Sequence, residues 1–110
     1  MVLDVTFRRD SRNRLSSVFA DGHADTAVHG EDIVCAAVSA ILQAARLGLE
    51  EHAKVSLEVE QRPGRLALRW PEDRRDDPAV IAIVATAELA ASRIAEQYPK
   101  HVRVRSAVEA

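Results

Sequence analysis

The sequence lacks the features of a secreted or nucleic-acid-binding protein. Its single cysteine, Cys35, rules out a disulfide within the chain, which fits a reducing compartment and predicts a cytoplasmic protein. Aromatic residues make up only 4% and the formal net charge is −2, so we expect no direct contact with nucleic acid. The longest apolar run, 79–91, is shorter than the about 20 residues that a bilayer requires and contains Thr86 and Glu88, so we expect no membrane span.

The composition is that of one globular domain. Hydrophobic residues make up 47% and charged residues 29% of 110 residues, which is the size of a single ordinary domain, so we treat residues 1–110 as one unit. Because aromatic residues are few, the core must consist of Val, Ile, Leu and Ala.

The spacing of apolar residues predicts seven elements in the order ββαββαβ. Alternation indicates strands over 2–8, 15–20, 55–59 and 66–70 and a short one over 102–105, whereas repeats of three and four indicate helices over 31–49 and 78–98. Asp77 and Pro78 form a strong helix start, and Gly48 is expected to end the first helix. The order predicts an α+β, two-layer sandwich with one mostly antiparallel or mixed sheet packed against two helices.

Two surface features remain open to interpretation. We expect the polar turn at 10–11 and the charged loop at 72–77 to face solvent. The second helix carries an apolar stripe that either packs on its own sheet or forms, in part, a contact with a second copy; it consists of Val80, Val84, Ala87, Ala91, Ile94 and Tyr98.

The residues with chemical potential lie around the start of the first helix. Cys35 falls in its first turns, where unpaired backbone N–H groups favour an anion and hence a nucleophilic thiolate. Asp32, Cys35 and Ser39 are three and four residues apart, so they project from one side of the helix, together with Gln43. This polar strip is a candidate catalytic surface.

His23 is the candidate partner of the thiol. It precedes Cys35 by twelve residues on the loop over 21–30, and its imidazole could act first as a base and then as an acid. Gly22 and Gly30 flank the loop, and we expect them to let it open and close over a peptide.

Simpler interpretations compete with catalysis. A lone cysteine in an alanine-rich helix is commonly a small core residue, and a histidine on a loop is commonly just solvated. Asp32 could serve only the helix start, and Ser39 only as a small polar spacer. The ligand types also permit a zinc site made of His23, Asp25, His29 and Cys35, although the spacing matches no standard structural site.

The same segment carries a specific pattern of residues. It reads Gly22-His23-Ala24, then Gly30, then the block Asp32-Ile33-Val34-Cys35-Ala36-Ala37-Val38-Ser39. This pattern resembles the signature of the ribosomal-processing cysteine protease Prp family, also called YsxB-like, and the likeness extends over essentially the whole chain.

The resemblance implies a function and its residues. It implies a catalytic dyad of His23 and Cys35 supported by Asp32 and Ser39, with no cofactor. The implied reaction is endoproteolytic removal of a short N-terminal extension from the twenty-seventh protein of the large ribosomal subunit, by a homodimer. His29 is a competing candidate for the base, and a non-catalytic ribosome-associated module is the remaining alternative.

Overall fold

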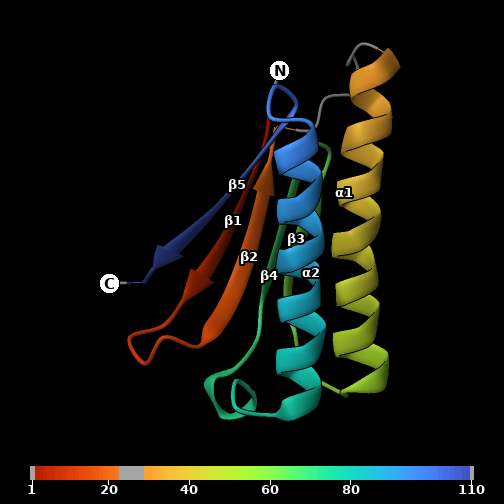
Figure 1. Ribbon diagram of the computed structural model, residues 1–110. Coiled ribbons are helices and arrows are strands. Elements are labelled where there is room, and N and C mark those ends of the chain that lie inside the picture. The colour runs from red at the N-terminus through yellow and green to blue at the C-terminus, as the bar shows by residue number, and fades with distance from the viewer. Residues whose placement is uncertain (1, 23–28, 110) are drawn as a thin grey trace.

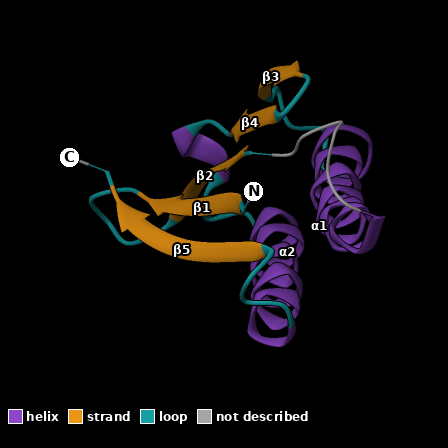
Figure 2. Cartoon of the chain, turned by 90° about the horizontal axis from the view of Figure 1, so that it is seen from above, coloured by secondary structure: helices purple, strands orange, loops and turns teal. Residues whose placement is uncertain are grey.

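Two layers make up the part of the chain that the computed structural model describes, which is residues 2–22 and 29–109, with the backbone alone for residues 29–32. One layer is a five-stranded sheet and the other is a pair of helices, both on the same face of the sheet (Figure 1, Figure 2). The expected α+β class and the order ββαββαβ are confirmed.

The sheet is mixed. It runs in the order β3-β4-β2-β1-β5, with β1 and β5 parallel and all other neighbours antiparallel; the strands are β1 (Leu3–Arg9), β2 (Leu15–Asp21), β3 (Glu58–Arg62), β4 (Arg65–Arg69) and β5 (Val102–Val108). The predicted start of the third strand at Val55 was wrong, because β3 begins only at Glu58. Val55 is nevertheless buried, so the alternation before Glu58 reported burial rather than pairing.

The helices cover the apolar face of the sheet. They are α1 (His29–Leu47), which continues into a π-helical turn over Gly48–His52, and α2 (Pro78–Gln97). The Asp77 carboxylate accepts a hydrogen bond from the Ala79 N–H at 2.9 Å and caps α2, as expected. Four members of the predicted α2 stripe are buried, which confirms packing on the sheet, whereas Tyr98 lies beyond the helix and is 46% exposed.

Gly48 does not end the first helix. The chain stays helical through it, and a Cβ on Gly48 would lie 3.2 Å from Ile83 Cδ1 of α2. The glycine therefore allows α1 and α2 to approach closely. The reversal occurs later, near Lys54, which has a positive φ of 57°.

Both helical stretches meet a length and mean-hydropathy criterion for membrane-spanning helices, although the apolar run 79–91 alone was too short to span a bilayer. Among the described residues, Ile33–His52 and Pro78–Gln97 are each long and apolar enough to cross a bilayer by length and composition alone. Core helices of globular proteins meet the same criterion, and each helix here packs one face on the sheet. The property is therefore weak support for a membrane span.

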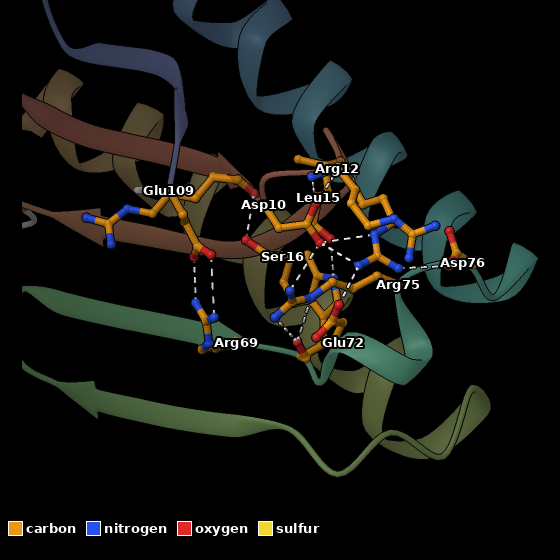
Figure 3. Close-up of polar contacts among 12 residues, drawn as sticks. Asp10, Arg12, Leu15, Ser16, Arg69, Glu72, Arg75, Asp76 and Glu109 are labelled. Atoms are coloured by element: carbon orange, nitrogen blue, oxygen red, sulfur yellow. Dashed lines mark hydrogen bonds and ion pairs between the residues drawn. The ribbon is translucent and has the colours of Figure 1, made fainter.

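The sequence predicted that Asp10 faces solvent in a turn, and this prediction was wrong. Its carboxylate is buried and accepts hydrogen bonds from the backbone N–H groups of Arg12 and Arg14 and from the guanidinium groups of Arg14 and Arg75 (Figure 3). Burial alone would raise the pKa of Asp10, but these hydrogen bonds outweigh it and hold the pKa well below its ordinary value. The network joins the β1–β2 turn to the loop before α2.

Arg75, which is also buried, links this network to the end of β4 at Trp70. It donates two hydrogen bonds to the Trp70 carbonyl oxygen, at 3.2 and 3.0 Å, and one to Asp10 at 3.2 Å. We expect Arg75→Met to lower the free energy of unfolding by about 1.5–3 kcal/mol in urea titrations, because the Trp70 carbonyl oxygen loses two hydrogen bonds and the buried Asp10 carboxylate loses one of its two guanidinium partners while it keeps Arg14. Arg93→Met on the exposed side of α2 is the control, with a change of roughly 0.5 kcal/mol or less. Equal effects would contradict the assignment.

Candidate active site

Cys35 lies in the second turn of α1, on the side that faces the sheet. Its side chain is 4% exposed and belongs to the hydrophobic core. Because α1 begins at His29 rather than at residue 31, Cys35 is two residues deeper in the helix than predicted. The field of the helix end falls off within the first turn, so it contributes less at the sulfur than the sequence suggested. The first four N–H groups, which have no partner within the helix, belong to residues 29–32.

The polar strip predicted along α1 borders a cleft. Ser39 follows Cys35 by one helical turn, and Gln43 follows by another, both half-buried. Together with Leu42 they form one wall of a cleft of about 340 Å³, whose floor is Leu3 and Ala20 and whose far wall is the β3–β4 hairpin, residues 61–66. The structure therefore places an open space one turn away from the candidate nucleophile.

Gly22 was expected to give the loop mobility, but its backbone is held in a conformation that only glycine can adopt. Its φ is +106°, and a Cβ would lie only 2.5 Å from the carbonyl oxygen of Val2. Its N–H donates a hydrogen bond of 3.1 Å to the carbonyl oxygen of Gly64 in the β3–β4 turn. Only glycine fits these requirements, so Gly22 sets the direction in which the chain leaves β2 toward His23. Gly30 does not flank a loop: it lies in the first turn of α1.

We expect Gly22→Ala to reduce peptide cleavage. The added Cβ would push the backbone away from Val2 and displace the segment that carries His23, and a displacement of about 1 Å at a catalytic group costs roughly 100-fold in rate. The measurement is kcat/KM on a peptide substrate, with circular dichroism to establish folding. Gly48→Ala is the control, since it crowds only a side chain, Ile83, away from this segment. Wild-type activity in a folded Gly22→Ala protein would refute the positioning role.

Two predicted site residues lie outside what the structure describes, namely His23 and the side chain of Asp32. The proximity of His23 to Cys35 therefore stays a prediction. The zinc alternative also involves His23 and Asp25, which fall outside the described residues. Among the side chains of residues 2–22 and 33–109, no group of three or more His, Cys, Asp or Glu is placed to hold a metal ion.

Comparison with known proteins decides the family. A family model described as cysteine protease Prp matches residues 2–103, which includes Gly22, the His23 segment, Cys35 and Ser39. The chain belongs to the cysteine protease Prp family. The resemblance inferred from the sequence is thus confirmed, and so is the enzyme class, a cysteine protease.

A curated relative and two solved structures resemble this chain over nearly their full length. The ribosomal processing cysteine protease Prp of Staphylococcus aureus is 27% identical over 107 residues, covering 94% of this chain and 96% of the relative. The crystal structure of SMU.848 from Streptococcus mutans has a TM-score of 0.83 at 28% identity, covering 98% of this chain and 96% of that one. The S. aureus Prp crystallised with a substrate peptide has a TM-score of 0.85 at 22% identity, covering 96% and 99%, and shows the shared fold.

The hairpin side of the cleft was not identified from the sequence. Pro63 and Gly64 signalled a turn, but nothing in their spacing indicated that the turn would face α1 or bond to Gly22. The bond to Gly22 joins residues 42 positions apart, and the turn lies 20 to 25 positions from Ser39 and Gln43, so periodicity within one segment cannot reveal these contacts.

Proposed function

We propose that this chain is an endopeptidase in which Cys35 is the nucleophile and His23 transfers the protons. The observation that supports this best is the position of Cys35 on α1, one turn from Ser39 and the cleft that Ser39 borders. Gly22 at the end of β2 starts the segment with His23 at the same end of the molecule as the start of α1 (Figure 1).

The chemistry follows from these two groups. His23 removes the thiol proton, and the Cys35 thiolate attacks the carbonyl carbon of the scissile peptide bond. The oxyanion accepts hydrogen bonds from free N–H groups at the start of α1. His23 then protonates the leaving amine, which leaves a thioester on Cys35. Finally His23 takes a proton from water, the resulting hydroxide attacks the thioester, and the thiol and a new carboxylate are released. Asp32 orients His23 or holds its loop.

We further propose that the substrate is the N-terminal extension of the twenty-seventh protein of the large ribosomal subunit, processed in the cytoplasm. The support is the family match together with the S. aureus relative, which is named for ribosomal processing. The single cysteine agrees with a reducing compartment.

A cleavage assay tests this proposal directly. The purified chain is incubated with the host's ribosomal protein bearing its native N-terminus, and intact-mass spectrometry follows the reaction. Loss of one defined N-terminal piece is the expected result. Binding without cleavage, combined with a thiol that reacts with iodoacetamide no faster than an ordinary cysteine, would instead favour the non-catalytic ribosome-associated module.

We propose that the chain forms a homodimer through the outer face of its helices. Residues 33–45 contain no charged residue, and Ile33 is 63% exposed. A groove of about 500 Å³ runs between α1 and α2; its lining includes Ile41, Ala44, Ile83 and Thr86. The Thr86 hydroxyl donates to the Ala82 carbonyl oxygen at 2.6 Å, so even this residue has its polar group satisfied within the helix. Apolar faces of this kind commonly mark contacts with another protein.

Ala44→Glu should convert the dimer to a monomer. The carboxylate would have to be buried without a partner in the groove between the two copies. Sedimentation equilibrium measures the change, and the expected increase in the dimer dissociation constant is at least about 100-fold. Ala107→Glu on β5, whose register partner Arg8 is exposed on the face away from the helices, is the matched control. An unchanged dissociation constant in Ala44→Glu would place the interface elsewhere.

A further inference from the structure

β5 forms an open edge of the sheet, away from the cleft. It pairs with β1 on one side and has no strand on its other side among the described residues (Figure 2). Edge strands are commonly protected by a proline, a bulge or a short length. β5 has seven residues, contains no proline and keeps one register with β1 throughout, whereas the opposite edge, β3, has only five residues. β5 is therefore the longer and less protected edge.

Backbone groups of β5 point out of the sheet along this edge. Successive residues of a strand direct their N–H and C=O groups to opposite sides. The His101 carbonyl oxygen accepts a hydrogen bond from the Leu3 N–H at 2.9 Å, and the Glu109 N–H donates to β1 at 2.7 Å, so the odd-numbered residues of β5 face β1. Val104 and Ser106 consequently direct their backbone groups outward, where no residue of the described chain bonds to them.

The two faces of β5 differ in chemistry. Val102 and Val104 lie on the helix side and belong to the core or pack against it, whereas Arg103 and Arg105 lie on the outer side. A depression of about 340 Å³ lies between the last turns of α2 and the start of β5. The apolar part of its lining consists of Ala95, Pro99, Val102 and Val104. A strand added at this edge would direct alternate side chains toward the depression and toward the arginines.

The outer side of the edge carries an excess of positive charge. Residues 97–108 contain Lys100, Arg103 and Arg105 but no Asp or Glu, although the chain has a net charge of −2. Arg103 and Arg105 both form ion pairs with one carboxylate oxygen, Asp4 Oδ1, at 3.8 and 3.1 Å. One carboxylate cannot neutralise two guanidinium groups, and the two side chains are 58% and 53% exposed. Both arginines therefore keep N–H groups that can donate to a further carboxylate.

We propose that β5 binds, as an additional strand of the sheet, an extended segment of another protein in which apolar and acidic residues alternate. The backbone of that segment pairs with Val104 and Ser106. Its apolar side chains enter the depression beside α2, and its carboxylates contact Arg103 and Arg105.

Other occupants match the edge less well. Antiparallel pairing of β5 with the β5 of a second copy would place the arginines of both copies on one face, where like charges repel each other. An RNA strand would use the arginines but leave the backbone groups of the edge unpaired, and Glu96 in the depression would repel its phosphates. The alternating peptide alone satisfies the backbone, the apolar surface and the charge together.

Peptide binding tests the proposal. The probe is a fluorescein-labelled peptide of alternating Glu and Val with seven residues, the length of β5, and fluorescence anisotropy measures its binding to the full chain. A peptide with Lys in place of Glu should bind about tenfold more weakly, because its charges meet the arginines. Methylation of the Val amide nitrogens should block antiparallel addition, and methylation of the Glu amide nitrogens should block parallel addition. Equal binding of both methylated peptides would refute strand addition.

Ser106 provides a matched pair of protein variants. It is exposed and its N–H points to the open edge, so Ser106→Pro removes an edge donor and leaves the ladder with β1 intact. Binding of the Glu-Val peptide should weaken by about tenfold. Ser106→Ala removes the hydroxyl but keeps the N–H, and it should bind as the wild type does. Circular dichroism checks folding, and the methylated peptides decide the question with wild-type protein if Ser106→Pro does not fold.

A second pair of variants tests the charge. Arg105→Gln should weaken binding of the Glu-Val peptide by about two- to fivefold at low salt. Arg62→Gln, at the opposite edge of the same sheet, is the matched control and should have no effect. A loss in Arg62→Gln but not in Arg105→Gln would place the peptide at the β3 side of the sheet and overturn the proposal.

Amide hydrogen exchange measured by NMR locates the bound peptide. The amides of Val104 and Ser106 should exchange about tenfold more slowly in the complex, whereas those of Arg103 and Arg105, which already face β1, should change little. Three outcomes would refute the proposal: no binding of the Glu-Val peptide, tighter binding of a uridine oligonucleotide that Arg105→Gln weakens, or a change of the self-association constant in Ser106→Pro. The second would assign the edge to RNA, and the third to a second copy of the chain.

Discussion

Cys35→Ala is expected to lower kcat/KM for peptide cleavage by about 10⁴-fold or more, because no other side chain can supply the thiolate. The fold should survive, since alanine is smaller than cysteine by one sulfur atom and the position lies among many core contacts. Cleavage is followed by mass spectrometry, and folding by thermal unfolding. Cys35 is the only cysteine, so iodoacetamide labelling reports on this one thiol and must vanish in the variant.

The result also decides between the two interpretations of Cys35. If the residue served only the core, Cys35→Ala would lose some stability and keep its activity. Val38→Ala, at a fully buried position one turn along α1, is the matched control for packing. It should lose stability by about 0.5–3 kcal/mol and retain most cleavage at temperatures where it is folded. Loss of activity in parallel with stability in both variants would argue against a nucleophilic Cys35.

The architecture could be predicted because its signals are local. Alternation in 2–8 and 15–20 and the three-and-four spacing of Val80, Val84, Ala87 and Ala91 each arise from one buried face, and each was confirmed. The Asp77 cap likewise involves neighbouring residues only. Predictions that depend on distant contacts were wrong. Gly48 was expected to end the first helix, but it provides room for Ile83 of α2. Asp10 was expected to face solvent, but it is buried and bound by Arg75, which lies 65 positions later in the chain.

The candidate site was likewise predicted only where its signals are local. The strip of Cys35, Ser39 and Gln43 followed from the helical period, and the structure places Ser39 and Gln43 on the cleft. The hairpin wall and the constraint on Gly22 did not follow, because Gly64 and Val2 approach Gly22 only in the folded chain. The family could be recognised from the sequence because its motif is local and lies within residues 22–39, and the match over residues 2–103 confirmed it.

His23→Gln should also abolish cleavage, and His29→Gln should not. Glutamine keeps a polar side chain of similar reach but cannot exchange a proton near neutral pH, so it removes acid–base function with little change in size. The expected loss for His23→Gln is at least about 10²- to 10⁴-fold in kcat/KM, the usual contribution of a general acid–base group. His29 is the first residue of α1, whereas His23 follows the glycine whose direction is fixed by Gly64.

The pH dependence identifies which protonation step each histidine serves. Wild-type kcat/KM should follow a bell-shaped profile whose limbs report the Cys35–His23 pair rather than either residue alone. In His23→Gln the residual activity should rise with pH, because only direct ionisation of the thiol remains to form the nucleophile. Iodoacetamide labelling of Cys35 should slow at neutral pH in that variant and recover at alkaline pH. If His29→Gln caused these changes and His23→Gln did not, the base would be His29, at the first residue of the helix that carries the nucleophile.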